Sequence, residues 1–409
     1  MQCFIFIEIS NNFMNIASLK YLKSQGIKVI LFCKNILIYN NEITRFCDDV
    51  MEINTHQISS LISACNFVAK KEKIIGIMTL NDQFLFHTAE LKEYLGFQTT
   101  TSKNIENLIN RFKMRTQLKK INANLNPKFN YARNFNESVL FATEIAYPFI
   151  IRPIARNKFI YSKRINNLSE LKDFFNNDYA KTIYQSWEYY VPGVLLEEEI
   201  IGDEYSVHFL KTCDGKIILS GVFKKESIIL KDRSFINITT QFPANYKETD
   251  YLFQTLSPII PKIGFNLGLL QIDCILSGNN IKVIDINPTI NSNIINYFMI
   301  RKSTGIDFSK INIDIHLKNE IDWHPSYLKG VVLYNNVKDF SEEFMSRNLF
   351  EKINENNYEI FQINNATYDD YNHERDSGAS IMVVSNSRET SLELVKNLTS
   401  YQKIMQKVS

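Results

Sequence analysis

One segment constrains the fold more than any other: residues 267–288, LGLLQIDCILSGNNIKVIDINP, in which two apolar runs flank a stretch of glycine and asparagine. This pattern predicts a β-hairpin that turns near Gly278. Asp285 and Asn287 stand two residues apart at the end of the second run, so their side chains share one face of the strand, and Pro288 ends it. Taken alone, Asp-x-Asn at a strand end more often caps a turn than binds a ligand.

A third polar residue, Asp273, lies on the first run, twelve residues before Asp285. If the two acids share a face, regular pairing requires an odd number of loop residues, and a three-residue loop over 278–280 suits this because glycine and asparagine tolerate positive φ. A two-residue loop would place the acids on opposite faces unless a β-bulge restored their register. Because neighbouring like charges repel, we expect the pair to be tolerable only beside a bound cation. Exchanging Asp285 for Asn should then leave the fold intact, or slightly more stable when no metal is bound.

Composition excludes several classes of protein. The 409 residues correspond to about two to four domains of ordinary size, and a formal net charge of +2 gives no electrostatic reason to expect nucleic acid or an anionic membrane as a partner. No apolar run approaches the roughly 18 residues of a membrane span, and the opening MQCFIFIEIS lacks the features of a signal peptide. The cysteines form no CxxC pair and the histidines no HxH or HExxH, so we expect reduced thiols in a cytoplasmic protein and no histidine-based metal site.

Residues 1–100 alternate short apolar runs with amphipathic stretches. This alternation predicts a small α/β layer with a parallel sheet, and Gly26 and Gly96 stand where helix C-terminal caps are expected. Neither GxGxxG nor GxxxxGK[ST] follows any of the apolar runs, so the region contains neither a dinucleotide fingerprint nor a P-loop. We interpret it as a scaffold.

A basic helix follows. Residues 103–120 are predicted to form one helix capped by Ser102, with Arg111, Lys113 and Arg115 on the face opposite its apolar stripe. Such a face, taken alone, is by default solvated.

The run YPFIIRPI, residues 147–154, predicts a buried strand bracketed by prolines. It carries a single charge, Arg152. Because a buried and unpaired guanidinium is costly, we expect Arg152 to have an anionic partner.

An acidic region comes next. Residues 194–225 predict three consecutive strands joined by tight turns, one at Gly202 and one at Asp214-Gly215. Three glutamates crowd the first turn: Glu197, Glu199 and Glu204. Taken alone, these glutamates are equally compatible with a solvated edge strand.

Taken in order, these features resemble the ATP-grasp superfamily, in particular the carboxylate-amine ligase branch that includes the D-alanine-D-alanine ligases and the L-amino acid ligases. The family's lysine helix is similar to RFKMR through Lys113, and its basic strand is similar to YPFIIRPI through Arg152. Its acidic turn is similar to EEEIIGDE, and its metal hairpin is matched through Asp273, Asp285 and Asn287. The likeness spans nearly the whole chain, to the closing GASIMVVSNSRETSLELV.

This resemblance implies an ATP-grasp fold of mixed α/β and α+β class. The implied divisions are a pre-ATP-grasp α/β domain over residues 1–100, an N-terminal ATP-binding lobe over 101–190, a C-terminal lobe with the metal hairpin over 191–315, and a C-terminal α+β subdomain over 316–409. The implied cofactors are ATP and Mg²⁺.

The resemblance also implies a role for each matching residue. The ATP-binding residues would be Lys113 and Arg152 at the phosphates, where they would also be catalytic, Glu197, Glu199 and Ile200 at adenine, and Glu204 at the ribose. The Mg²⁺ ligands would be Asp273, Asp285 and Asn287. Mg²⁺ takes hard oxygen ligands and keeps water and substrate phosphate in several positions, so two carboxylates and an amide are enough protein.

Three features depart from the family pattern. Arg152 stands where lysine is usual, and the loop over 155–163, ARNKFIYSK, has no glycine that would let backbone N–H groups cover the phosphates. The stretch NPTINSN, residues 287–293, lacks the arginine that usually follows the metal-binding asparagine. We expect another basic residue, Arg301 or Arg233, to contact the substrate carboxylate, and we count Arg301 among the candidate catalytic residues.

The leading hypothesis is an ATP-dependent ligase that converts a carboxylate into an acyl phosphate and lets an amine displace phosphate, which forms an amide or peptide bond. Its partners would be small carboxylates and amines, amino acids foremost, with no nucleic acid and no membrane, and a homodimer is left open. The missing glycines and the missing arginine motivate a rival of another class, a degenerate ATP-grasp protein that binds nucleotide or a partner without catalysis. A third interpretation, a plain metabolite-binding α/β protein, treats the order of the motifs as chance.

Overall fold

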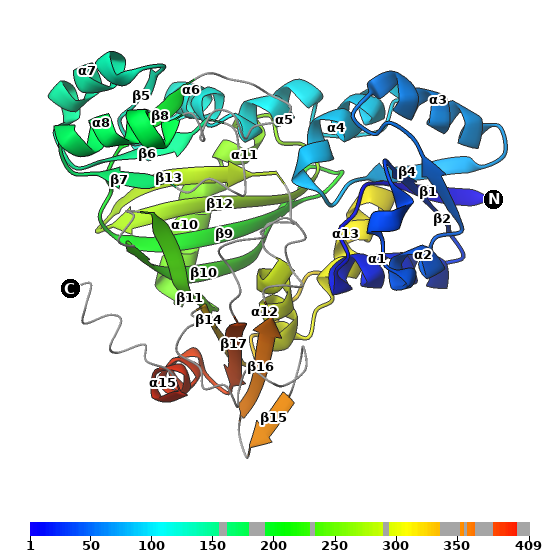
Figure 1. Cartoon of the computed structure of the whole chain (residues 1–409). Helices are drawn as coiled ribbons and strands as arrows, with labels where there is room; N and C mark the ends of the chain where they lie inside the picture. The colour runs from blue at the N-terminus through cyan, green and yellow to red at the C-terminus, as the bar shows by residue number, and fades with distance from the viewer. Residues whose placement is uncertain are drawn as a thin grey trace.

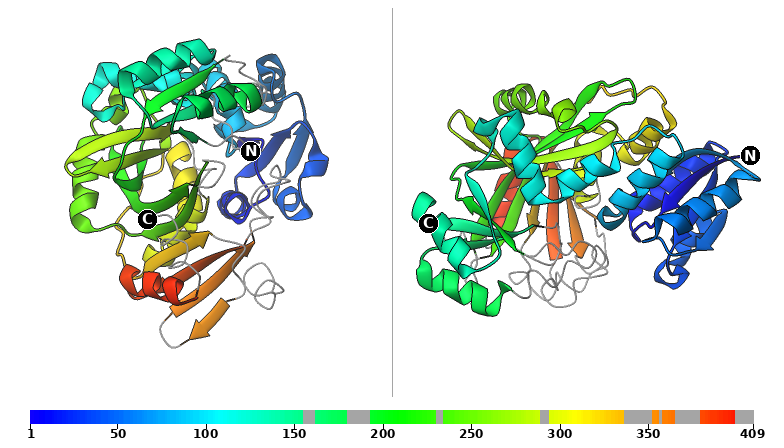
Figure 2. Two further views of the ribbon diagram at one scale, coloured as in Figure 1. Left: turned by 60° about the vertical axis from the view of Figure 1, so that its left-hand side comes forward. Right: turned by 90° about the horizontal axis from the view of Figure 1, so that it is seen from above.

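Three β-sheets organise the chain (Figure 1). The computed structural model describes residues 1–154, 162–179, 193–229, 234–288, 294–335, 352–355, 358–364 and 379–398. Figure 2 shows the N-terminal layer standing to one side of the two other sheets. No helix within these ranges is long and apolar enough to cross a membrane, and all six cysteines are free thiols.

The first sheet has four parallel strands in the order β3-β2-β1-β4. Its strands are β1 (Gln2–Ile7), β2 (Lys28–Cys33), β3 (Asp49–Glu52) and β4 (Lys73–Met78). Its helices are α1 (Phe13–Ser24), α2 (Asn41–Phe46), α3 (Ile58–Ala69) and α4 (Leu85–Tyr94). Strand β1 is buried on both faces, since Phe4 and Phe6 pack with α1 while Cys3 and Ile5 pack with α3. The predicted parallel α/β layer is confirmed, and Gly26 and Gly96 have the positive φ expected after a helix end.

The largest sheet has nine antiparallel strands in the order β13-β12-β9-β10-β11-β14-β17-β16-β15. The first five along the chain are β9 (Asp203–Lys211), β10 (Ile217–Ile229), β11 (Phe235–Phe242), β12 (Gly268–Ser277) and β13 (Asn280–Asn287). The other four are β14 (Gly330–Asn335), β15 (Lys352–Glu355), β16 (Tyr358–Asn364) and β17 (Ala379–Ser385). The strands beyond residue 316 thus extend this sheet instead of forming a separate one.

Helices cover both faces of the large sheet. One face packs against α10 (Tyr246–Leu256) and α11 (Ile259–Lys262), and the other against α12 (Ile294–Thr304) and α13 (Phe308–Leu317). Helix α15 (Arg388–Leu398) packs on the strands at the C-terminal end of the sheet. Short 3-10 turns occur at Ile36–Ile38, Asp82–Phe84 and Ala123–Leu125.

The third sheet is small and lies beside the β12–β13 edge of the large one (Figure 1). Its antiparallel strands β5 (Phe129–Ala132), β8 (Val194–Glu198), β6 (Phe149–Pro153) and β7 (Lys163–Ile165) follow one another in that order across the sheet. Helices α7 (Phe135–Ile145) and α8 (Leu168–Asn177) pack on one face through an apolar cluster. The opposite face instead meets α6 (Arg111–Ile121), whose Phe112 contacts Phe129 and Tyr131 of β5.

Three sequence predictions of local structure are wrong. The helix expected over 103–120 is broken at Asn110 into α5 (Ser102–Ile109) and α6 (Arg111–Ile121), because the side chain of Asn110 caps α6 by accepting from the N–H of Lys113. Thr101, not Ser102, caps α5. The turn at Gly202 does not close a hairpin, since β8 pairs with β5 and β6 while β9 pairs with β10 and β12.

Gly202 lies in this crossing between two sheets, where the chain passes close to β12. A Cβ atom at this position would lie 2.4 Å from the carbonyl oxygen of Leu276. Because that atom belongs to a paired strand, it cannot move aside cheaply. We expect Gly202→Ala to lower the free energy of unfolding by about 1–3 kcal/mol, as overpacking does, measured by urea denaturation. The matched control is Ile201→Ala, at a side chain that is 81% exposed, and a Gly202→Ala protein as stable as this control would contradict the close approach.

Candidate functional site

Strands β12 and β13 are joined by a two-residue turn, Gly278-Asn279, so the predicted three-residue loop is wrong. Regular pairing would then put Asp273 and Asp285 on opposite faces. Instead the two acids are direct cross-strand partners, because the register shifts beside them and Ile284 is the extra residue of a β-bulge. The bulge returns both carboxylates to one face of the sheet.

The carbonyl oxygen of Ile284 accepts hydrogen bonds from two arginines. Arg115 Nη2 donates to it at 2.7 Å and Arg152 Nη1 at 2.8 Å. A bulge leaves its extra residue outside the regular ladder, so its carbonyl needs a donor from elsewhere. Arg115 belongs to α6 and Arg152 to β6 of the small sheet. The bulge is therefore held by groups from outside the large sheet.

The small sheet meets the β12–β13 edge of the large sheet at a place that we call the junction. Arg152 reaches it because side chains alternate along β6. Phe149 and Ile151 pack under α7 and α8, which turns Arg152 to the other face of the small sheet. There Arg152 is 7% exposed, with Nη1 3.3 Å from Glu197 Oε2 and Nη2 3.3 Å from Asp285 Oδ2. The predicted anionic partner is confirmed, and Arg152 has two of them.

Helix α6 contributes two more arginines. Arg111 Nη2 lies 3.2 Å from Asp285 Oδ2. Arg115 is fully buried and donates through Nε to Glu197 Oε1. A solvated basic face is therefore the wrong interpretation for Arg115.

Lys113 turns away from this cluster: it is exposed and its ammonium group pairs with Glu106. Its implied contact with phosphate stays a prediction. Sequence reasoning missed the arginines on either side of it, although a signal was present. Arg111 and Arg115 precede Leu118 with the i, i+4, i+7 spacing of one helix face, so they continue the buried stripe.

Glu197 remains ionised although it is buried. Burial alone would raise the pKa of this carboxyl, but the charges of Arg115 and Arg152 outweigh burial and hold its pKa below the ordinary value. The carboxylates of Glu197 and Asp285 in turn raise the pKa of Arg152 despite its burial. The junction is thus a set of paired ions with little access to water.

The second acid of the hairpin has its own cation. Lys225 Nζ lies 2.9 Å from Asp273 Oδ1, and Gln271 Nε2 donates to the same carboxylate at 2.9 Å. Burial would raise the pKa of Asp273, but Lys225 and these hydrogen bonds lower it. His208 nearby stays neutral, because burial lowers its pKa to about 3.

The three implied magnesium ligands present oxygen atoms on one face of the hairpin. Asp285 and Asn287 are two residues apart on β13, and Asp273 lies opposite. Carboxylate and amide oxygens suit Mg²⁺, so the donor set fits the ion. No three His, Cys, Asp or Glu side chains in the described ranges form a metal-binding group by themselves. Ligation would therefore need Asn287 together with oxygens from water or phosphate.

The expectation that the two acids require a bound cation is wrong, because two arginines and Lys225 already supply positive charge beside them. The expected effect of Asp285→Asn on stability is reversed for the same reason. An asparagine would leave the guanidinium groups of Arg111 and Arg152 without the charge of this partner. We now expect the substitution to destabilise the fold.

The other implied site residues have the following contacts. Glu199 pairs with Arg164 at 2.7 Å, and Glu204 accepts from Ser227 Oγ at 2.9 Å. Ile200 follows β8 in the crossing to β9. Arg301 is exposed on α12, 3.8 Å from Asp307, and does not join the cluster. Arg233, Thr289 and residues 155–161 of the glycine-free loop lie outside the described residues.

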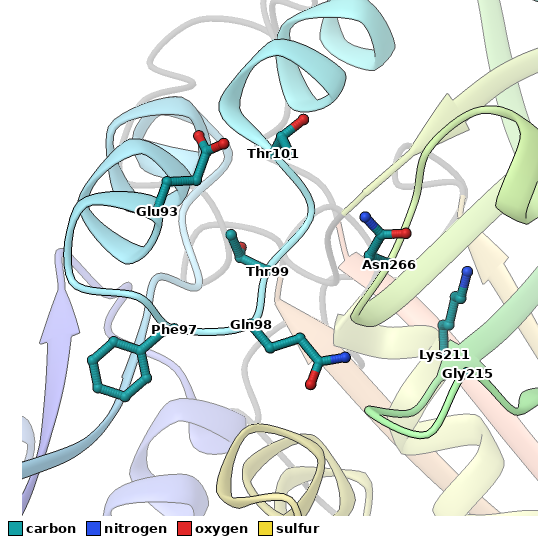
Figure 3. A pocket seen from close by; sticks show the side chains of 8 residues that line it. All are labelled: Glu93, Phe97, Gln98, Thr99, Thr101, Lys211, Gly215 and Asn266. Carbon is teal, nitrogen blue, oxygen red and sulfur yellow. The ribbon is translucent and has the colours of Figure 1, made fainter.

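A cavity of about 440 Å³ lies between the segment that joins α4 to α5 and the turn that joins β9 to β10 (Figure 3). Its charged groups are already bonded within the protein. Glu93 Oε2 accepts from the backbone N–H of Ser102 at 2.8 Å, and Lys211 Nζ donates to the carbonyl of Phe265 at 2.7 Å. None of the site residues named above lines this cavity, so it adds no chemistry to the cluster.

Two of the basic residues of α6, Arg115 and Lys113, should differ sharply in their contribution to stability. Arg115→Met removes one of the two cations beside buried Glu197 and a donor to Asn126, Val283 and Ile284. We expect a loss of about 3–5 kcal/mol in the free energy of unfolding. Lys113→Met, two residues away and exposed, should change it by less than about 0.5 kcal/mol. Urea denaturation of both variants measures the difference, and equal midpoints would show that the buried network does not stabilise the fold.

No family model matches the sequence. The large chain of carbamoyl phosphate synthase from Campylobacter jejuni is 25% identical over 341 residues, which cover 77% of this chain and 29% of that protein. This chain therefore spans less than a third of the length of that curated relative, and the same holds for the corresponding protein of Thermoanaerobacter pseudethanolicus.

Solved structures match over nearly the full chain. The L-amino acid ligase from Bacillus licheniformis superposes with a TM-score of 0.72 at 17% identity and covers 97% of both chains. N5-carboxyaminoimidazole synthetase from Staphylococcus aureus, in complex with ADP, superposes with a TM-score of 0.72 at 14% identity and covers 97% of this chain and 96% of that one. The chain therefore has the ATP-grasp fold that its motifs predict.

Proposed function

We propose that this chain is an ATP-dependent carboxylate-amine ligase. In the proposed reaction a carboxylate oxygen attacks the γ-phosphorus of ATP and ADP leaves, which forms an acyl phosphate. An amine then attacks the acyl carbon, phosphate leaves and the amine loses a proton, so that an amide bond results. The fold supports this proposal, as do the names of its neighbours, among them an amino acid ligase and a synthetase in complex with ADP.

The observation that carries the proposal is the ion pair between Arg152 of the small sheet and Asp285 of the large sheet. One comes from β6 and the other from β13, and they lie 3.3 Å apart beside Glu197. Phosphoryl transfer needs mainly positioning and neutralisation of charge. Guanidinium groups grip carboxylate and phosphate oxygens with the same planar fork. Arg111 and Arg152 could therefore exchange Asp285 for a phosphate group without leaving the junction.

Magnesium would be held by Asp273, Asp285 and Asn287 in this proposal, and when bound it would neutralise charge on the phosphate oxygens. As the arginines turn to phosphate, they would release the carboxylate of Asp285. Lys225 would hold Asp273 in place from the other side, at 2.9 Å.

Adenine would lie beside the end of β8. The side chain of Glu197 is occupied by Arg115 and Arg152, and its position in β8 pairs on both sides, with Phe129 and Ile150. The backbone of residues 199 and 200, beyond the last residue of the strand, is therefore the better candidate for adenine recognition. Glu204, on the following strand, would accept from the ribose hydroxyls.

A second candidate function is nucleotide or partner binding without catalysis. It is favoured by the ion pairs that already occupy Asp273 and Asp285, and by the outward positions of Lys113 and Arg301. Under this alternative the cluster only holds the two sheets together.

The test uses the purified protein with ATP, Mg²⁺ and pooled amino acids and small carboxylic acids, and measures ADP release and melting temperature. We expect turnover in the unmodified protein, and Asp285→Asn should lower it by orders of magnitude, remove the stabilisation by Mg²⁺ and ATP, and lower the melting temperature without ligand. Glu144→Gln, which removes an acid from the exposed side of α7, should leave all three unchanged. An unmodified protein that neither releases ADP nor is stabilised by Mg²⁺ and ATP would contradict the proposal. Stabilisation without ADP release would favour the second candidate.

Arg152 should contribute to nucleotide affinity through its charge. Arg152→Ala should weaken ATP binding at least about tenfold, as loss of a charge-assisted hydrogen bond does. Arg152→Lys keeps the charge and restores the residue usual in the family, so it should retain much of the affinity. Isothermal titration calorimetry with ATP and Mg²⁺ measures both. Wild-type affinity in the alanine variant would assign Arg152 to packing alone.

A further inference from the structure

A second cavity, of about 80 Å³, lies between the N-terminal layer and the large sheet. Its walls come from β4 and α4 on one side and from the start of β12 and helix α13 on the other. Figure 1 shows α13 next to the strands of the N-terminal layer. A single water molecule needs only about 10–15 Å³ by a comparable measure, so this cavity can hold a small organic ion.

One wall carries a buried cation. Lys92 is 6% exposed, and neither a charge nor a hydrogen bond from a described residue contributes to the shift in the pKa of its ammonium group, which leaves burial alone. Burial lowers the pKa of Lys92 to about 8. Thr88 lies one helical turn before Lys92 and lines the same cavity, and its buried hydroxyl has no hydrogen-bond partner in the described part of the chain. A buried ammonium group without an anion is costly, which makes this wall unusual.

The opposite wall adds a donor and an acceptor. The side-chain nitrogen of Asn312 is buried and has no hydrogen-bond partner among the residues that the structure describes. His316, one turn later on α13, donates through Nδ1 to the carbonyl oxygen of Asn312 at 2.8 Å. Burial and the nearby charge of Lys92 lower the pKa of His316 to about 3, so its ring is neutral and Nε2 is an acceptor.

We propose that this cavity binds a small carboxylate, whose oxygens accept hydrogen bonds from Lys92, Asn312 and Thr88. Lys92 and two donors that lack partners among the described residues line one space, and Lys92 is cationic, which is the arrangement that an anion satisfies. The neutral acceptor at His316 Nε2 would suit an N–H group on the same ligand. An amino acid carries both groups.

The position of the cavity links it to the junction of the sheets. Pro288 lines the cavity and directly follows Asn287, the last residue of β13. If the proposed ligase function holds, on which this assignment rests, the ligand is one of the two substrates. Lys92 then acts as a specificity residue that positions the substrate and does not touch the reacting phosphate.

The larger cavity also has a buried lysine in its wall, which can be compared with Lys92. Lys211 lines it and is also buried, but its ammonium group already donates to Phe265. It therefore serves as a matched control for removal of a buried lysine.

The experiment measures binding of acetate and glycine without nucleotide, by isothermal titration calorimetry, with acetamide and inorganic phosphate as further probes. We expect both carboxylates to bind the unmodified protein and acetamide not to. Lys92→Met should raise the dissociation constants at least about tenfold, the amount expected from a charge-assisted hydrogen bond. It should also raise the melting temperature without ligand, because an uncompensated buried charge is removed. Lys211→Met should leave carboxylate binding unchanged.

A second variant tests the cavity without substituting Lys92. Asn312→Asp places a carboxylate inside the cavity, where it pairs with Lys92 and should abolish binding of acetate and glycine while the protein stays folded. The inference is overturned if neither carboxylate binds the unmodified protein, if Lys92→Met binds them as tightly as the unmodified protein, or if phosphate binds more tightly than both.

Failure of this inference is distinguishable from failure of the ligase proposal. Carboxylate binding that depends on Lys92 in a protein that never releases ADP would contradict only the ligase proposal. ADP release by Lys92→Met with unchanged KM values for both substrates would contradict only the assignment of the cavity.

Discussion

The carbonyl oxygen of Ile284 accepts hydrogen bonds from Arg115 and Arg152, and the geometry of the junction follows from this pair of contacts. Ile284 is the extra residue of a bulge in β13. Without the bulge Asp285 would share the face of Val283, which belongs to the apolar core, and with it Ile286 takes that place. Arg115 and Arg152 thus support the backbone conformation that turns Asp285 towards the guanidinium groups of Arg111 and Arg152.

This arrangement makes the junction electrostatically self-contained. Three arginines and Lys225 face Glu197, Asp285 and Asp273, and the pKa values of Glu197 and Asp273 lie below their ordinary values despite burial. Buried ion pairs seldom add much stability over apolar packing, but losing one partner is costly. A nucleotide that entered here would substitute phosphate for carboxylate at guanidinium groups that are already oriented, so the reorganisation would be small.

The interface between the N-terminal layer and the large sheet contains polar groups that differ from those of the junction. At the junction of the two other sheets the charged groups pair with one another. At the second cavity, buried Lys92 stands beside Thr88 and Asn312, which each have a buried polar atom without a partner in the described part of the chain. Protein interiors satisfy most of their buried polar atoms, so two exceptions beside a buried lysine around one space are informative. The N-terminal layer, which has no nucleotide motif of its own, would in this way take part in ligand recognition.

Local patterns in the sequence determined the parallel N-terminal sheet, the β12–β13 hairpin and the need of Arg152 for an anionic partner, because periodicity and the cost of an unpaired charge are properties of short segments. They did not determine the bulge at Ile284, since the donor that supports it, Arg115, is 169 residues away. Nor did they show that β8 and β9, which follow one another in the sequence, belong to different sheets, or that Arg115 rather than Lys113 faces inward. Those outcomes depend on which surface each element packs against, and only the tertiary structure decides that. A buried charge is costly without a partner and tolerated beside an opposite charge, and its partners come from distant parts of the chain.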